Sequence, residues 1–208
     1  MNVSNVSNVV FYDDDPLNII EVSKINIKSI LISNIPVNLT YKDSNYYKNF
    51  INNTYFETYK QGGMPSQGFN RKHGEELIKW VKHTSKPIVI FDWDRTITCF
   101  DGFVLYDSPF TYSSNGVKIQ HVLEYICGGK ARLQFLSEIF NSIRKINELT
   151  HGEIFIVTNN PGAVNNKEEF IKLIRAIDPH FKEKCLLYGN GNKRFALLTS
   201  DYFMNIIK

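Results

Sequence analysis

Two aspartates in the middle of the chain, Asp92 and Asp94, directly follow the apolar run 88–91. Side chains alternate along a strand, so residues two positions apart face the same side and the two carboxylates can enter one pocket. Like charges held that close repel each other and lose hydration, which a fold tolerates when a cation or a reaction uses them. The pair therefore indicates a charged site at a strand end; the alternative is an ordinary strand end with solvated acids.

The elements that must position these acids alternate between short apolar runs and segments with helical spacing. Strands are predicted at 9–12, 27–33, 88–91, 154–157 and 185–188, and helices at 17–22, 74–83, 119–126, 130–149, 167–176 and 195–207, with 34–70 irregular. This alternation predicts an α/β fold, a Rossmann-like parallel sheet flanked by helices. Ligands bind at the carboxyl ends of the strands in such sheets, so residues that follow a strand are the candidates for chemistry.

Three further strand ends carry polar residues that can join the central pair. Asp13 and Asp14 follow the first strand, Thr158 and Asn159 follow the fourth, and Lys193 lies in the loop after the fifth, just ahead of a helix. Taken alone, a threonine is a common strand-end residue and a lysine is usually solvated. Only their placement relative to the central acids makes them candidates for one site.

The haloacid dehalogenase (HAD) superfamily of phosphatases and phosphotransferases has a similar set of motifs. Its first three motifs resemble, in order, Ile-Phe-Asp92-Trp-Asp94-Arg-Thr96, Ile-Val-Thr158-Asn-Asn and Lys193. The family's fourth motif, an apolar strand ending in paired acids, normally follows the lysine, but nothing after Lys193 supplies it. The run Val-Val-Phe-Tyr-Asp13-Asp14-Asp15 near the start of the chain is similar to that fourth motif.

This order of motifs looks like a circular permutation of the HAD fold. The segment 9–33 and the sequence Gly-Met-Pro-Ser-Gln-Gly at 63–68 also resemble magnesium-dependent phosphatases of that superfamily. If the chain ends were joined, Asp13 would follow Lys193 after about 28 residues, a reasonable span for a helix, a loop and a strand. We therefore expect the Asp13 strand to lie parallel beside the Asp92 strand, with both carboxylates in one pocket.

The resemblance implies a Mg²⁺-dependent phosphatase that works through an aspartyl-phosphate. Asp92 would be the nucleophile, and Asp94 would protonate the leaving oxygen and then activate water. Mg²⁺ would bind Asp92, the backbone carbonyl of Asp94, and Asp13, with Asp14 behind these ligands or bound through water.

The same resemblance gives roles to the remaining strand-end residues. Lys193 would keep the nucleophile ionised and neutralise phosphate charge, while Thr158, Asn159 and nearby backbone N–H groups would hold phosphate oxygens. Asp15 is expected to start a helix. Arg95 departs from the family, which often has a small residue there, and it either contacts phosphate or points to solvent.

Composition limits the cellular setting and the class of protein. The 208 residues fit one HAD-like domain with a small cap insert at about 100–130, and the net charge of +3 suits an anionic substrate. Cys99, Cys127 and Cys185 are widely separated, which argues against a disulfide or zinc framework and favours a reducing, cytoplasmic location. We expect no signal peptide and no membrane span.

The sequence does not distinguish between several classes of substrate. A small insert suggests an open site for a phosphorylated small molecule, a phosphoprotein or a nucleic-acid end. The basic segment 71–86 motivates one alternative, a nucleic-acid-end or nucleotide phosphatase. The other is a non-catalytic HAD-fold interaction protein, which would gain nothing from an intact set of repelling acids.

Overall fold

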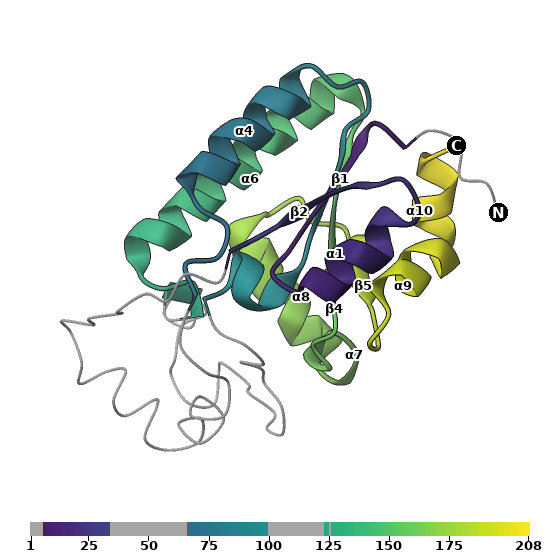
Figure 1. Ribbon diagram of the computed structural model, residues 1–208. Helices are drawn as coiled ribbons and strands as arrows, with labels where there is room; N and C mark the ends of the chain where they lie inside the picture. The colour runs from purple at the N-terminus through teal and green to yellow at the C-terminus, as the bar shows by residue number, and fades with distance from the viewer. Residues whose placement is uncertain (1–5, 34–65, 100–122, 125) are drawn as a thin grey trace.

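The chain forms an α/β fold around one sheet of parallel strands (Figure 1). The computed structural model describes residues 6–33, 66–99, 123–124 and 126–208. Its five strands run in the order β2-β1-β3-β4-β5, and their bounds are β1 Val9–Asp13, β2 Lys28–Leu31, β3 Ile88–Phe91, β4 Glu153–Thr158 and β5 Leu186–Tyr188. The predicted parallel sheet flanked by helices is therefore confirmed.

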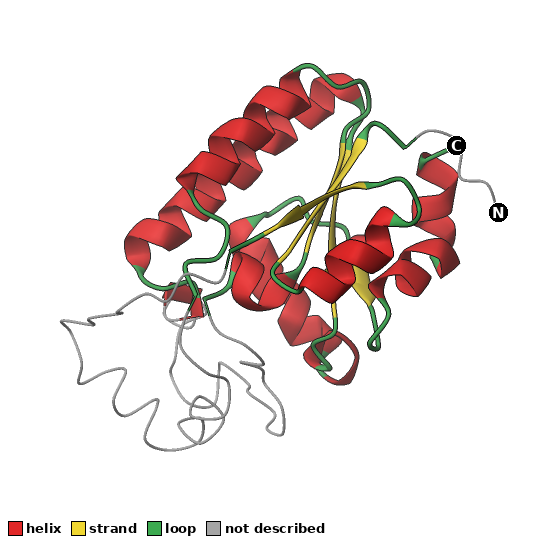
Figure 2. Ribbon diagram, in the orientation of Figure 1, coloured by secondary structure: helices red, strands yellow, loops and turns green. Residues whose placement is uncertain are grey.

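Helices cover both faces of the sheet (Figure 2). Their bounds are α1 Pro16–Ser23, α4 Arg71–Lys82, α6 Lys130–Thr150, α7 Gly162–Asn165, α8 Lys167–Ile177, α9 Lys193–Thr199 and α10 Asp201–Ile206. The long helices α4 and α6 pack side by side on one face, whereas α1, α9 and α10 gather on the other. The central strands β1, β3 and β4 are buried along their whole length, which explains why their sequences are mainly continuous apolar runs instead of alternating ones.

The first strand of the chain lies inside the sheet, between β2 and β3. It pairs in parallel with β3, with Val9 opposite Ile88 and Tyr12 opposite Phe91. All five of its residues are buried. The prediction that the Asp13 strand lies parallel beside the Asp92 strand is confirmed, and the acids that follow the two strands emerge at the same edge.

Capping side chains set helix boundaries that differ from those predicted. The helix predicted from Gly74 begins at Arg71, because the Asn70 side chain accepts a hydrogen bond from the His73 N–H and the His73 ring accepts one from the Asn70 N–H. The helix predicted over 195–207 is two helices, since Ser200 caps α10 through the Phe203 N–H. The second strand is shorter than the predicted 27–33. The predicted irregular segment 34–65, most of the 119–126 helix and most of the cap insert lie outside the described residues.

A buried polar network lies at the amino end of β4, opposite the candidate site. Arg144 of α6 donates to Glu153 at 2.7 Å and to Asp178 at 2.6 Å, and Lys182 and Tyr202 also donate to Glu153. Each carboxylate is almost fully buried, so these pairs satisfy groups that would otherwise be costly to bury. The network joins α6, α8, β4 and α10 at this edge.

Two further expectations from composition can be compared with the structure. The three cysteines are buried free thiols, so no disulfide joins them. Among the described residues, no helix combines the length and the apolar character that crossing a bilayer requires.

Candidate active site

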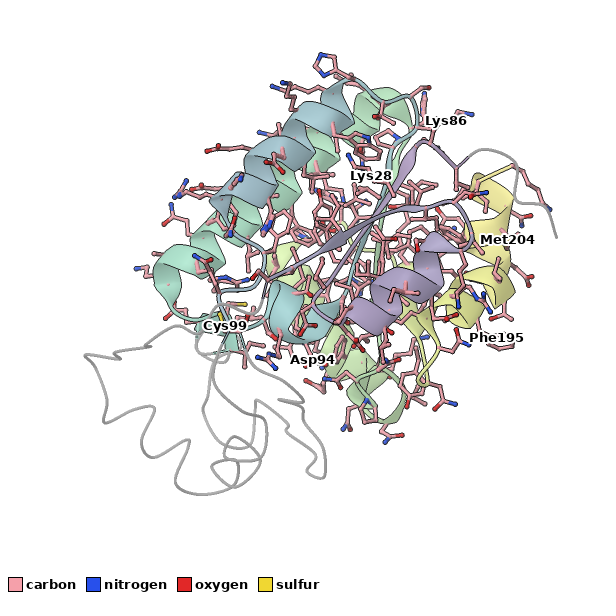
Figure 3. All side chains as sticks on the ribbon, in the orientation of Figure 1. Lys28, Lys86, Asp94, Cys99, Phe195 and Met204 are labelled. Atoms are coloured by element: carbon pink, nitrogen blue, oxygen red, sulfur yellow. The ribbon has the colours of Figure 1, made fainter. Side chains whose placement is uncertain are left out.

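A cleft of about 340 Å³ opens at the carboxyl ends of the strands. It has mostly acidic and amide walls, formed by Asp14, Asp15, Pro16, Asn18, Asp92, Asp94, Asn159 and Lys193. Figure 3 shows Asp94 at this edge and Lys86, which precedes β3, at the opposite end of the sheet. The position agrees with the general placement of ligand sites in parallel α/β sheets.

One buried lysine joins the acids of the two central strands. Lys193 is the first residue of α9 and only 2% exposed, and its Nζ lies 2.7 Å from Asp13 Oδ2 and 2.7 Å from Asp92 Oδ1. Burial alone would lower the pKa of Lys193, but attraction to Asp92 and Asp13 outweighs it and raises the pKa above its ordinary value. The lysine therefore stays charged, and the expected meeting of Asp13 and Asp92 in one pocket is confirmed.

Three carboxylates in this cluster could hold a metal ion. Asp13, Asp14 and Asp92 each offer an oxygen, and these oxygens lie within 4.8 Å of one another. Oxygen ligands bind Mg²⁺ at about 2.1 Å, so oxygens on opposite sides of the ion are about 4.2 Å apart. The cluster therefore fits a small hard cation after a small adjustment. Asp14 belongs to this group of possible ligands together with Asp13 and Asp92.

The cluster carries more negative charge than one lysine can neutralise. Burial raises the pKa of Asp92 well above its ordinary value; Lys193 opposes that shift, whereas Asp13 and Asp94 add to it. A divalent cation at these oxygens would add positive charge that favours the ionised form of Asp92. The spacing of the carboxylate oxygens and the excess of negative charge thus both favour a bound cation.

Asp94 is held by a residue that the sequence analysis missed. The side-chain nitrogen of Asn160 donates to both carboxylate oxygens of Asp94, at 3.2 and 3.1 Å. The orientation of this amide is fixed, because its oxygen accepts a hydrogen bond from the Gly162 N–H at 2.9 Å. The Asp94 carboxylate lies outside the three-carboxylate group, which leaves it available for proton transfer.

Asp13 is oriented by the start of α1. Its Oδ1 accepts hydrogen bonds from the Asp15 N–H at 2.9 Å and from the Asn18 side chain at 3.3 Å, which leaves Oδ2 for the lysine. Asp15 itself accepts from the Leu17 N–H and caps the helix, as predicted. Asn18 was not predicted, because an asparagine on a helix gives no sequence signal of the carboxylate it will contact.

Thr158 and Asn159 occupy different positions. Asn159 lines the cleft, and its Oδ1 accepts from the Gly191 N–H at 3.0 Å. Thr158 is fully buried at the end of β4 and is not among the lining residues; its hydroxyl oxygen accepts from the Asn160 N–H at 3.0 Å. The threonine thus shapes the turn that delivers Asn159 and Asn160 to the site.

Close packing holds Asn159 next to Lys193. A Cβ atom at Gly189 would lie 2.4 Å from Asn159 Oδ1 and 2.9 Å from Cγ of Lys193. Only glycine leaves room for the two side chains to approach at this point. Gly189, directly after β5, therefore contributes to the site through its small size.

Arg95 lies at the rim of the site, in the π-helical turn η1 (Trp93–Ile97) that follows Asp92. Its Nε is 3.9 Å from Asp14 Oδ2, and its side chain is 25% exposed. The side chain therefore does not simply point to solvent, and its contact with phosphate stays a prediction.

Comparisons with protein-family models, with curated proteins and with solved structures found no match for this chain. The chemistry of the site is therefore argued from its residues.

Proposed function

We propose that the protein is a Mg²⁺-dependent HAD-type phosphatase that hydrolyses phosphate monoesters through an aspartyl-phosphate on Asp92. The observation that carries the proposal is the shared ion pair of Lys193 with Asp13 and Asp92, beside a second acid, Asp94. A structural ion pair needs one carboxylate, whereas Lys193 pairs with two, and Asp14 and Asp94 line the same cleft. Such crowding has a use when the site receives a cation and a phosphoryl group.

The proposed reaction uses the two acids in sequence. A carboxylate oxygen of Asp92 attacks phosphorus, and the bond from phosphorus to the ester oxygen breaks while Asp94 gives that oxygen a proton. A water molecule then attacks the phosphorus of the aspartyl-phosphate and passes a proton to Asp94, which releases inorganic phosphate and restores both acids. Asn160 supports this cycle, because its amide keeps the Asp94 carboxylate in one orientation.

Positive charge must accompany this covalent route. Enzymatic acceleration of phosphate-monoester hydrolysis reaches about 10²¹-fold, and general acid–base help supplies only about 10²–10⁴ of it. Lys193 provides one buried cation beside Asp92. Mg²⁺ held by Asp13, Asp14, Asp92 and the Asp94 carbonyl would supply the remaining charge stabilisation at the phosphoryl oxygens.

The placement of β1 also supports a circularly permuted HAD fold. The strand that carries the acid pair lies beside β3 although it comes first in the chain. The Asn8 side chain donates to the Lys86 carbonyl, and Lys86 lines the same hollow as Ile206, the last residue of α10, and Lys208. The last helix therefore ends near the point where β1 begins, as a permutation of the motif order requires.

A screen of phosphate monoesters with Mg²⁺ and with a chelator tests the proposed function. We expect Mg²⁺-dependent release of phosphate by the wild-type protein, and none by a folded Asp92→Asn variant. Acid quenching during turnover should trap one phosphoryl group per chain, located on Asp92 by peptide mass spectrometry. Turnover by Asp92→Asn at the wild-type rate would reject the mechanism, and failure with every ester class would favour a non-catalytic interaction protein.

A further inference from the structure

Arg95 has a backbone conformation that arginine rarely adopts. Its φ is +55°, in the left-handed region, where a Cβ atom is disfavoured and glycine is the usual residue. The Arg95 N–H donates to the Thr98 hydroxyl at 3.2 Å, which helps to hold the turn. Strained positions of this kind persist where a side chain is needed at a site.

The guanidinium of Arg95 is only partly used by the protein. Its Nε is buried and has no hydrogen-bond partner within the described part of the chain, and its distance from Asp14 is that of a loose ion pair. Lys193, in contrast, is fully engaged by two carboxylates. Arg95 is therefore a cation beside the acids with at least one donor, Nε, that no described residue satisfies.

The position of Arg95 decides which part of a ligand it can reach. It is not among the residues that line the cleft, and it contacts Asp14 at the cleft wall. A phosphoryl group bound at Asp92 and Lys193 would lie inside the cleft, whereas Arg95 lies behind the wall residue Asp14, outside the space that this group would fill. Arginine forks bind phosphate and carboxylate groups with two parallel hydrogen bonds.

We propose that Arg95 selects substrates that carry a second anionic group next to the scissile phosphate. The proposal rests on the proposed function, since it takes the cleft as the place of the scissile group. Two sources could supply that second group: a neighbouring phosphate, as in a nucleotide or a nucleic-acid end, and a carboxylate, as in a phosphorylated amino acid.

Equilibrium binding to a catalytically inactive protein tests this selection without turnover. In Asp92→Asn protein with Mg²⁺, calorimetry compares adenosine 3′,5′-bisphosphate with adenosine 5′-monophosphate, and O-phosphoserine with phosphoethanolamine. We expect the doubly anionic member of one pair to bind roughly 10- to 100-fold more tightly. A preference within the adenosine pair identifies the second anionic group as a phosphate, and a preference within the phosphoserine pair identifies it as a carboxylate. Asp94→Asn serves as a second inactive background if Asp92→Asn does not fold.

Substitution of Arg95 then shows whether this residue causes the preference. Arg95→Gln in the same background should bring the affinity ratio close to one, while Arg71→Gln, which removes an equal charge from the exposed start of α4, should keep it. Arg95→Gly should also lose the preference, yet raise the melting temperature because glycine relieves the left-handed backbone.

Two results would overturn the proposal: equal binding within both pairs, or an unchanged ratio in Arg95→Gln. Failure of the proposed function is a separate result, because it shows as an absence of phosphate release by the wild-type protein. A binding preference that depends on Arg95 would stand in that case as the property of an anion-binding cleft.

Discussion

Lys193 and Asp13 are 180 positions apart in the chain, yet the lysine Nζ lies 2.7 Å from Oδ2 of the aspartate and both side chains are buried. Their contact joins the first strand to the start of α9 and brings Asp92 into the same cluster. Carboxylates buried this close together depend on the positive charge of Lys193 for their stability.

Replacing Lys193 by methionine should destabilise the metal-free protein by about 3–5 kcal/mol, because two buried carboxylates would lose their charged partner. Urea unfolding in the presence of a chelator measures the loss. Added Mg²⁺ should recover part of it, since a divalent cation neutralises the same oxygens. The matched control is Lys172→Met, whose exposed pair with Glu169 should contribute little to stability.

Mg²⁺ should stabilise the wild-type protein in proportion to its binding. At a concentration 100-fold above Kd, the expected gain is about 2.7 kcal/mol, or a rise of roughly 5–10 °C in melting temperature. Asp13→Asn should abolish most of the rise, and Asp201→Asn, at the exposed start of α10, should leave it unchanged. An equal rise in both variants would place the metal elsewhere.

Asn160→Ala should lower kcat for phosphate release by roughly 10- to 100-fold, because the Asp94 carboxylate would lose the donor that fixes its orientation. The loss should be larger for esters with poor leaving groups, which depend most on protonation. Asn165→Ala, on the exposed side of α7, is the control. In an Asp94→Asn background the Asn160 substitution should have little further effect, and full additivity would contradict the pairing.

The buried network around Glu153 predicts a specific acid sensitivity. Burial alone would raise the pKa of Glu153, but hydrogen bonds from Lys182, Arg144 and Tyr202 outweigh it and lower the pKa below its ordinary value of 4.5. A carboxyl whose pKa is lowered in the folded state stabilises the fold fully at pH values above its unfolded-state pKa. This contribution is lost as the pH falls through the folded-state pKa.

Comparison with a variant isolates that contribution. Glu153→Gln should cost about 1–3 kcal/mol at pH 7, and the difference from wild type should shrink as the pH falls below about 4.5. Chemical unfolding across this range measures it. A difference that stays constant from pH 7 to pH 3 would show that the charge of Glu153 does not stabilise the fold.

The sequence predicted the sheet well because the central strands β1, β3 and β4 contain apolar runs that stop at polar residues. The acids Asp13 and Asp92 stand at the ends of β1 and β3, and the pairing of these strands was predicted from the resemblance to a permuted order of motifs. Lys193 was predictable only by resemblance to a motif order, since a lysine before a helix gives no local sign of burial. Its two partners come from strands that precede it by 180 and 101 positions.

The sequence did not predict the residues whose role depends on the orientation of a turn. Asn160 follows Asn159 directly, but the turn at Thr158 places one in the cleft and directs the other to Asp94. The left-handed backbone of Arg95 is likewise a result of the η1 turn. The early start of α4, in contrast, was available from Asn70 and His73, which form a capping pair three residues apart.

The contact between Lys193 and Asp13 also has a consequence for how the chain folds during synthesis. β1 leaves the ribosome first, but its neighbour β3 follows about 75 residues later and the lysine about 100 residues after that. Contacts of such long sequence separation form late, because closing the intervening loop costs entropy before any contact repays it. A nascent or truncated chain that lacks α9 would hold the acids without their lysine, so the cluster is complete only after α9 has been made.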